Sequence, residues 1–424
     1  MQDIFERITQ NPGPLGQFAD YGEGYFIFPR LEGPIGPRMK FQGKEVIFWS
    51  ANDYLGLCNH PEVLKTDAEA AAKYGMFYPM GARAMSGETE EHLKLERELA
   101  KFVQKESAYL LNFGYQGMFS TIQALVTRND VIVYDADSHA CIVDGVRLHF
   151  GKSFTYRHND IKSLEKNLQR ATKVAEDSGG GILVITEGVF GMRGQQGKLR
   201  EICALKKKYH FRLLVDDAHG FGTLGKTGAG TGEEQECQDQ IDVYFSTFAK
   251  SMAGFGAFIA GNKEIIRYLK FNLRSQIFAK SLTMPMVIGG LKRLELLRTR
   301  PEIKARLWDN VHKLQNGLKE QGFDLGDTNT CVTPVMIQGD PVEATFLVKD
   351  LRENYGIFTS VVVYPVIPKG MILLRLIPTA SHTDTEINET LAAFKFIYGK
   401  LISGVYKKQA ENFIKEQNLE FKAI

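Results

Sequence analysis

Lys250 is a candidate nucleophile. It stands in Ser246-Thr247-Phe248-Ala249-Lys250-Ser251, a segment that follows an apolar strand and leads into small residues. An amine at the end of a buried strand is partly desolvated, which lowers its pKa and makes it a better nucleophile toward a carbonyl carbon. Since a single lysine after a strand is more often a solvated surface group, this interpretation needs support from other segments.

A second segment, Asp216-Asp217-Ala218-His219, follows another apolar strand upstream of Lys250. Ligands of open α/β sheets bind at the carboxyl ends of the strands. A carboxylate there can keep a pyridine nitrogen protonated, so that the ring of pyridoxal phosphate becomes an electron sink for a carbanion. An aspartate before small residues also caps helices, and that alternative stays open for the segment taken alone.

Two further strand ends carry polar or small residues. His139, which follows Asp135-Ala136-Asp137-Ser138, offers a flat ring that can stack on a cofactor, although a lone histidine is more often structural. Gly114 and Tyr115 lie between a strand and an expected helix, where backbone N–H groups and the helix N-terminus can bind a phosphate. Because four such segments recur in order at strand ends, a cofactor site explains them better than independent surface features do.

Short apolar, β-branched runs predict the buried strands that position these residues, and segments between them have helical spacing. Alternation of this kind predicts an α/β fold with a mostly parallel sheet covered by helices. We expect an N-terminal arm over residues 1–60, a large domain over 61–295 and a small C-terminal α+β domain over 296–424. The expected strands are 108–112, 131–134, 182–186, 212–215, 242–245 and 257–260, then 331–337, 358–363 and 372–377; the expected helices include 161–175 and 199–209.

Composition excludes several classes of protein. The 424 residues carry a net charge of +2 without a basic stripe, so nucleic acid is not an expected partner. The five cysteines are far apart, which argues against structural zinc, and no secretory signal or long apolar run is present. We therefore expect a cytoplasmic protein. Residues 404–424 form an expected amphipathic helix, which either packs on the small domain or makes weak peripheral contact with a membrane.

Together these motifs resemble the α-oxoamine synthase family of pyridoxal phosphate enzymes, which includes serine palmitoyltransferase, 8-amino-7-oxononanoate synthase, glycine C-acetyltransferase and 5-aminolevulinate synthase. The resemblance runs from about Phe48 to His382, and many motifs share one order. Its anchors are Asn52-Asp53-Tyr54-Leu55-Gly56-Leu57, Ser86-Gly87-Glu88-Thr89, residues 92–96, Ser138-His139-Ala140, Thr186-Glu187-Gly188-Val189-Phe190, Asp216-Asp217-Ala218-His219, Thr247-Phe248-Ala249-Lys250-Ser251, and Arg375 with residues 379–383.

The resemblance implies fold type I, with a mostly parallel seven-stranded sheet in the large domain, and a homodimer with sites at the subunit interface. It implies that Lys250 forms the imine with the cofactor, Asp216 pairs with the pyridine nitrogen, His219 donates to the ring hydroxyl and His139 stacks on the ring. The implied phosphate ligands are Gly114, Tyr115 and Thr247, with Thr283 from the neighbouring subunit. The implied substrate residues are Asn52, Arg83 and Arg375, whose guanidinium suits a carboxylate.

The implied reaction is a decarboxylating condensation of an amino acid with an acyl-CoA or acyl-carrier-protein thioester. Two departures lie near the expected substrate: bulky residues 76–80 replace a glycine-rich run, and Gly191 and Arg193 stand where the family commonly has serine and an acidic residue. Either these loops have drifted, or the pocket takes a more anionic substrate.

The sequence resembles the serine palmitoyltransferase branch most, which favours a long acyl chain and serine or a sulfonated analogue such as cysteate. The alternatives are 8-amino-7-oxononanoate synthase or glycine C-acetyltransferase activity, an aminotransferase, and a binding protein with a relict site.

Overall fold

The protein is represented by a computed structural model, which describes residues 3–11, 13–16, 19–364, 366–368 and 370–416. Contacts between residues group the chain into two compact units. The larger unit contains Asn52–Trp308 and Asn329–Cys331, and the other contains Met1–Ala51, Asp309–Thr328 and Val332–Ile424. The domain boundaries expected at residues 60 and 295 remain a prediction.

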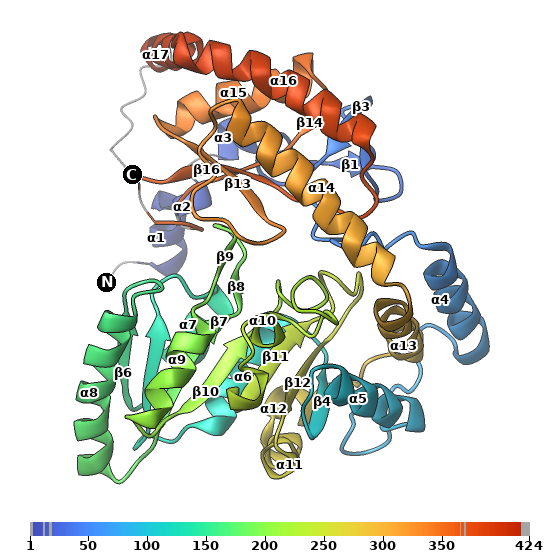
Figure 1. The fold of residues 1–424 in the computed structure, drawn as a ribbon, viewed down its shortest axis with the longest axis vertical. Helices are drawn as coiled ribbons and strands as arrows, with labels where there is room; N and C mark the ends of the chain where they lie inside the picture. The colour runs from blue at the N-terminus through green and yellow to red at the C-terminus, as the bar shows by residue number, and fades with distance from the viewer. Residues whose placement is uncertain (1–2, 12, 17–18, 365, 369, 417–424) are drawn as a thin grey trace. The chain divides into compact units, whose positions relative to one another are not determined.

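The larger unit is built around a seven-stranded sheet, as predicted from the resemblance (Figure 1). Neighbouring strands are parallel except at β12, which pairs antiparallel with both β11 and β4. The strands in sheet order are β4 (Ser107–Leu111), β12 (Ala257–Gly261), β11 (Val243–Thr247), β10 (Arg212–Asp216), β7 (Ile182–Glu187), β5 (Val131–Asp135) and β6 (Lys152–Tyr156).

Helices cover both faces of this sheet because its strands are apolar on both sides. Val131 and Val133 point into one core, whereas Ile132 between them belongs to the other, as the alternation of a strand requires. The helices that contribute to the first core are α5 (Glu90–Phe102), α8 (Ile161–Ser178), α9 (Leu199–Ala204) and α13 (Met284–Thr299). Those on the second are α6 (Gly114–Leu125), α7 (Ala140–Arg147) and α11 (Lys263–Asn272).

Several further elements complete the larger unit. The expected helix over residues 199–209 is shorter than predicted, since α9 gives way to a 3₁₀ turn at Leu205–Lys207. Helix α14 (Pro301–Glu320) begins in the larger unit and continues in the other. The remaining elements are α4 (Pro61–Tyr74), α10 (Thr231–Glu234), α12 (Arg274–Ile277), a second 3₁₀ turn at Gln238–Gln240, and the hairpin of β8 (Val189–Phe190) and β9 (Gln195–Gln196).

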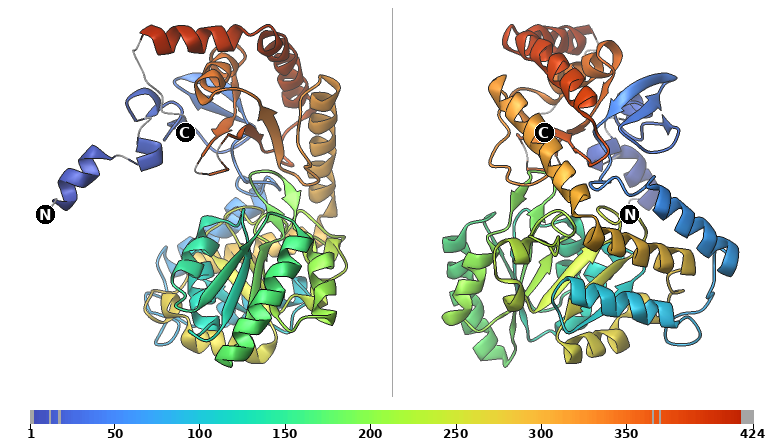
Figure 2. Two further views of the ribbon diagram at one scale, coloured as in Figure 1. Left: turned by 90° about the vertical axis from the view of Figure 1, so that its left-hand side faces the viewer. Right: turned by 45° about the vertical axis from the view of Figure 1, so that its right-hand side comes forward.

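The other unit joins residues from both ends of the chain, and Figure 2 shows its blue N-terminal strands beside orange and red C-terminal elements. Strand β3 pairs in parallel with β14, with Ile47 opposite Ile357. Its strands are β1 (Leu31–Glu32), β2 (Arg38–Phe41), β3 (Lys44–Phe48) and β14 (Ile357–Phe358) in one sheet and β13 (Thr333–Ile337), β16 (Ile372–Leu376) and β15 (Ser360–Val362) in another; its helices are α1 (Ile4–Gln10), α2 (Gly13–Gly16), α3 (Ala19–Gly22), α15 (Pro341–Asn354), α16 (Asp384–Ile402) and α17 (Val405–Glu416).

Helix α17 occupies the described part of the expected C-terminal amphipathic segment, and residues 417–424 of that segment lie outside the described residues. Its buried Tyr406 donates a hydrogen bond to Asp350 Oδ2 at 2.5 Å, and the rings of Phe413 and Phe346 lie 5.9 Å apart. The apolar side of α17 therefore packs on α15. Within the described ranges, no helix combines the length and the apolar character that crossing a bilayer requires.

Candidate active site

The predicted cofactor residues gather at the carboxyl ends of neighbouring strands. Asp216 ends β10 and lies opposite Glu187, the last residue of β7, while His139 follows β5 and Lys250 follows β11. Parallel strands end at the same sheet edge, so these side chains converge. Their charges interact, because the carboxylate of Asp216 experiences the fields of both Lys250 and His139.

The two adjacent aspartates have different surroundings, and Asp217 is held by internal hydrogen bonds. It accepts the backbone N–H of Thr231 at 2.8 Å, the Thr231 hydroxyl at 2.6 Å and the Tyr244 hydroxyl at 3.0 Å. A Cβ added to Gly188, Gly220 or Gly230 would approach an Asp217 oxygen to between 1.9 and 2.1 Å, so the backbone encloses it. Burial raises the pKa of Asp217 to about 7.

Asp216 makes fewer contacts and interacts with the charged groups of the site. Its carboxylate accepts the N–H of Ala218 at 3.1 Å, and the Cys141 thiol lies 3.9 Å away. Burial raises the pKa of Asp216, and the charges of Lys250 and His139 oppose that shift. Of the two aspartates, Asp216 is the one whose carboxylate interacts with the charges of Lys250 and His139.

Glu187 is a member of the site to which the sequence assigned no role. Its Oε1 accepts the backbone N–H of His139 at 2.5 Å, so it holds the start of α7, where His139 is the N-cap. Burial and the neighbouring Asp216 raise the pKa of Glu187 well above its ordinary value. A neutral Glu187 would add no negative charge beside Asp216.

The His139 ring is oriented by the helix that it caps. Its Nδ1 accepts the N–H of Cys141 at 3.3 Å, and the ring stands edge-on to Tyr115 with centroids 6.1 Å apart. His139 is exposed in a single chain, unlike the buried Asp216. An anchored, uncovered aromatic ring is suitable for stacking on another flat ring.

The start of α6 fits a phosphate. Phe113 is its N-cap, and in the described structure its side chain caps no N–H of the first turn. A Cβ on Gly114 would lie 3.1 Å from the hydroxyl of Thr247, so the first turn of the helix and that hydroxyl are adjacent. Helix N-termini with uncapped N–H groups bind anions.

Unmatched polar atoms also fit a polar cofactor. The hydroxyls of Ser138, Ser246 and Ser251 are buried and have no hydrogen-bond partner among the described residues. They neighbour His139, Thr247 and Lys250 in sequence. Buried polar atoms are usually paired, so each of these hydroxyls has the capacity for one further polar contact.

His219 is held against two residues distant in sequence. Its Nδ1 lies 2.6 Å from the hydroxyl of Tyr54, which is fully buried. A Cβ added to Gly191 would lie 2.0 Å from His219 Nε2. The sequence predicted His219 but not these partners, although Tyr54 lies in one anchor motif and Gly191 was recognised as a departure.

The predicted substrate residues are not all at this edge. Arg83 is buried, with NH1 on Glu96 at 2.9 Å and NH2 on Glu88 at 3.3 Å, so internal carboxylates already occupy its guanidinium. Asn52 is the first residue of the larger unit, whereas Arg375 lies on β16 of the other unit. Thr283 is the N-cap of α13, and within the described structure its side chain makes no capping bond.

Arg193, the unusual cation of the β8–β9 turn, is also paired. Its NH1 lies 2.8 Å from Asp137 Oδ2. Asp137 is itself 3.8 Å from His158, whose Nδ1 lies 3.0 Å from Asp135. Because Asp137 balances the charge of Arg193, this arginine adds less positive charge to the site than the sequence suggested.

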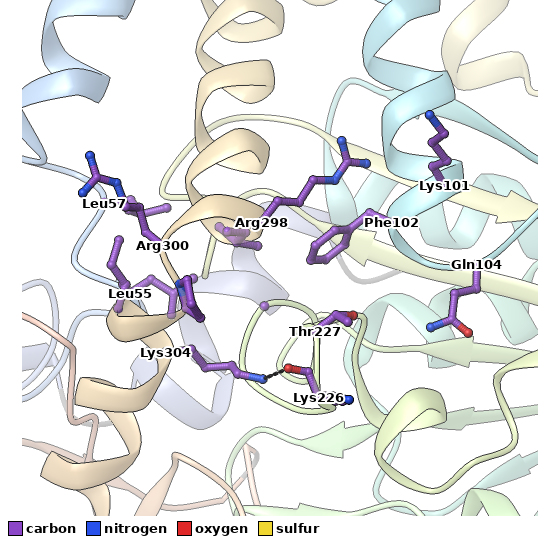
Figure 3. Close-up of a pocket in the computed structure, with 14 residues that line it drawn as sticks. Leu55, Leu57, Lys101, Phe102, Gln104, Lys226, Thr227, Arg298, Arg300 and Lys304 are labelled. Carbon is purple, nitrogen blue, oxygen red and sulfur yellow. Dashed lines mark hydrogen bonds between the residues drawn. The ribbon is translucent and has the colours of Figure 1, made fainter.

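A cavity of about 650 Å³ lies elsewhere in the larger unit (Figure 3). Its described lining includes none of the predicted cofactor residues and contains five cations together with apolar side chains such as Leu55 and Phe102. Arg298 pairs with Glu98, Arg300 with Glu62 at 3.3 Å, and Lys304 donates to backbone carbonyls that include Lys226 O at 3.0 Å. Most of these cations are therefore already engaged.

The fold and the residues at its sheet edge define a pyridoxal phosphate-dependent enzyme of fold type I. Residues 44–394 match the family of class I and II aminotransferases. The chain is 68% identical, over 98% of its length and 99% of the relative's, to a cysteate-C-fatty acyltransferase of Capnocytophaga ochracea. It is 36% identical, over 87% of its length and 90% of the relative's, to a serine palmitoyltransferase of Sphingobacterium spiritivorum.

Solved structures agree with the sequence relatives. Sphingomonas wittichii serine palmitoyltransferase has a TM-score of 0.86 at 28% identity, over 95% of this chain and all (100%) of that chain. A serine palmitoyltransferase structure with pyridoxal phosphate in its internal aldimine has a TM-score of 0.88 at 28% identity, over 94% and 99% of the two chains. The chain belongs to the aminotransferase class I and II family, as an α-oxoamine synthase-type acyltransferase that uses pyridoxal phosphate to condense an amino acid with an acyl group.

Proposed function

We propose that this enzyme condenses cysteate with a long-chain fatty acyl thioester, releasing carbon dioxide and the free thiol and forming a sulfonated α-oxoamine. The observation that carries the proposal is the 68% identity to a cysteate-C-fatty acyltransferase across nearly the whole of both chains. A serine palmitoyltransferase and an 8-amino-7-oxononanoate synthase are 36% and 37% identical over less of this chain, so serine and shorter acyl donors are the competing substrates.

Each residue at the sheet edge has a separate role in the proposed reaction. When bound, pyridoxal phosphate supplies the electron sink for negative charge at the α-carbon of the amino acid. Lys250 would hold the cofactor and take the α-proton on its amine, Asp216 would keep the ring nitrogen charged, and His139 would stack on the ring. His219 would donate to the ring hydroxyl, and Gly114, Tyr115 and Thr247 would hold the phosphate, with Thr283 of the second subunit.

The charged groups of the amino acid provide the contacts through which the enzyme binds it. Arg375 would bind the α-carboxylate, for which a planar guanidinium is suited. Asn52 is the second proposed substrate residue. Arg83 would act on substrate binding indirectly. Its guanidinium nitrogens already contact Glu88 and Glu96, so it holds the segment around residue 83 in place. The Arg193–Asp137 pair is a second candidate neighbour for the sulfonate.

The experiment is a substrate comparison on the purified holoenzyme with palmitoyl-CoA. Thiol release and product mass are measured with cysteate, cysteine sulfinate, serine and glycine, and Lys250→Ala protein serves as the inactive reference. Cysteine sulfinate keeps the charge and nearly the shape of cysteate, so it separates recognition of charge from recognition of the third oxygen. We expect cysteate to give the highest kcat/KM; a preference for serine or glycine would reject the proposal.

We also infer that the enzyme works as a cytoplasmic homodimer. Support for the dimer comes from exposed apolar residues of the larger unit, which include Phe77, Met80 and Phe278. A weak contact of α17 with a membrane surface remains a further inference, and the packing of Tyr406 and Phe413 leaves little of its apolar side for such a contact.

A further inference from the structure

Gly191 is required by its surroundings, not by its backbone conformation. Its φ lies outside the left-handed region, so any residue could adopt its backbone angles. The obstacle is the His219 imidazole: a Cβ on residue 191 would lie 2.0 Å from Nε2, 2.4 Å from Cδ2 and 2.5 Å from Cε1. The ring therefore occupies the volume in which a side chain at residue 191 would begin.

The contacts of His219 oppose any movement of its imidazole ring away from residue 191. His219 is 7% exposed, and its Nδ1 is 2.6 Å from the hydroxyl of the fully buried Tyr54. Its own backbone is held as well, because the Thr223 hydroxyl donates to the His219 carbonyl at 2.7 Å. A side chain at residue 191 would have to break the contact with Tyr54 or displace the turn after Asp216.

The contact with Tyr54 also bears on which ring nitrogen of His219 carries the proton. A neutral imidazole has one N–H, so Nε2 can donate only if Nδ1 accepts. The Tyr54 hydroxyl lies 2.6 Å from Nδ1 and can donate to it. With the hydroxyl as the donor, the proton of His219 is on Nε2, the atom beside Gly191.

We propose that Gly191 and Tyr54 are positioning residues that set the place and the tautomer of His219. The proposal rests on the proposed function, in which His219 donates to the ring hydroxyl of the cofactor. Gly191 leaves the space that the imidazole fills, and Tyr54 fixes the proton on Nε2. The proposal thus gives a steric role to the glycine that stands where related enzymes commonly carry serine.

The first test measures cofactor binding by the apoprotein. Gly191→Ala and Gly191→Ser should raise the dissociation constant of pyridoxal phosphate about tenfold or more, which corresponds to a loss of about 1.4 kcal/mol. Gly181→Ala is the matched control, because its Cβ would make only an ordinary 3.5 Å contact. The control should bind the cofactor like the wild type.

The second test asks whether His219 is the cause. In a His219→Ala background the obstacle is gone, so adding Gly191→Ala should change the dissociation constant less than about twofold, a non-additive result. Thermal melting of the apoproteins should follow the same pattern, with the double variant melting no lower than His219→Ala alone. This keeps the proposal testable even if Gly191→Ala alone folds poorly.

The third test follows the tautomer. Tyr54→Phe removes the donor to Nδ1 but leaves room for the ring, so the absorbance of the bound cofactor should titrate at a pH shifted from that of the wild type. A role of Tyr54 in packing alone would lower the melting temperature without moving that titration.

Three results would overturn the inference: wild-type affinity in Gly191→Ser, fully additive effects of Gly191→Ala and His219→Ala, or an unchanged titration in Tyr54→Phe. Failure of the proposed function is a separate result. In that case the wild-type protein binds pyridoxal phosphate but does not turn over cysteate, whereas the geometry around His219 would still be tested by the binding constants.

Discussion

At the scale of single residues, the adjacent pair Asp216 and Asp217 allows a direct comparison. Asp216→Asn should abolish turnover while leaving the melting temperature near that of the wild type, because Asp216 is placed to act on charge and makes few structural contacts. Asp217→Asn should keep turnover, because one amide oxygen can accept from Thr231 N and Tyr244 while the amide nitrogen donates to the Thr231 hydroxyl. Turnover and melting of both proteins are the measurements.

The same pair makes a prediction about pH. Burial raises the pKa of Asp217 from 3.8 to about 7 in the folded state. As the pH rises, the unfolded chain therefore loses this proton at a lower pH than the folded chain does. Stability should therefore fall as pH rises from about 4 to about 7, and Asp217→Asn should lack that part of the slope. An identical slope in the wild type and the variant would show that Asp217 is not the titrating group.

The site residues that the sequence predicts lie at or after the ends of buried strands, because strand ends and cofactor chemistry both leave local signals. Lys250, Asp216, His139 and His219 are of this kind. Tyr54 and Gly191 were missed as partners of His219 because their contacts join segments far apart in the chain. Arg193 was interpreted as added positive charge, since the sequence does not show that Asp137 lies 2.8 Å away.

At the scale of elements, substitutions at the uncapped N-terminus of α6 can distinguish an effect on helix stability from an effect on cofactor binding. Phe113→Asp should stabilise the apoprotein by about 1 kcal/mol, because an aspartate N-cap accepts a first-turn N–H. The same carboxylate should weaken binding of pyridoxal phosphate, because it repels the phosphate from the helix N-terminus.

Phe113→Asn is the matched control, since asparagine caps without charge. We expect Phe113→Asn to raise the apoprotein melting temperature similarly and to cost less affinity than Phe113→Asp. Equal affinity in wild type, Phe113→Asp and Phe113→Asn would place the phosphate elsewhere. Thermal melting and cofactor titration provide the two readouts.

A buried histidine ties together elements of the other unit. His382 donates from Nε2 to the Phe48 carbonyl at 3.2 Å, accepts the Thr379 N–H on Nδ1 at 3.1 Å and stacks on Trp49 at 4.0 Å. Burial lowers the pKa of His382 from 6.5 to about 4. The unfolded chain then binds the proton more readily, so stability should fall as pH drops from about 6.5 toward 4.

Equilibrium unfolding of wild type and His382→Gln across this pH range measures the effect. The variant should be less stable at neutral pH and should show a shallower slope, although His92, whose pKa burial also lowers to about 4, keeps part of the slope in both. His210→Gln, which changes an exposed histidine, should leave the slope unchanged. A slope unaffected by His382→Gln would assign the acid sensitivity to other groups.

At the scale of the whole molecule, alternation of strands and helices was enough to predict the fold class, because a parallel sheet buried on both faces needs apolar strands and crossover helices. The antiparallel β12 was not predicted, since a short apolar strand carries no signal of its direction. The pairing of β3 with β14 was not predicted either, because it joins residues more than 300 positions apart.

The last prediction concerns assembly. Phe77, Met80, Met85 and Phe278 are between 66% and 87% exposed in a single chain. Their segments adjoin, because Ser281 N donates to Gly81 O at 3.0 Å. Apolar exposure of this extent marks an interface, so the protein should have about twice its 47.6 kDa chain mass in solution. Phe278→Glu should give monomers, whereas Phe150→Glu, at another exposed phenylalanine, should not.

Mixing two inactive proteins then tests whether the subunits share sites. Thr283→Asp would place a negative charge where the second subunit is proposed to hold the phosphate, and Lys250→Ala removes the amine within its own chain. If Thr283 serves the partner's site, each mixed dimer regains one intact site, and random exchange should restore about one quarter of wild-type activity. Absence of recovery, with subunit exchange demonstrated by a mass-tagged chain, would place Thr283 and Lys250 in the same subunit's site.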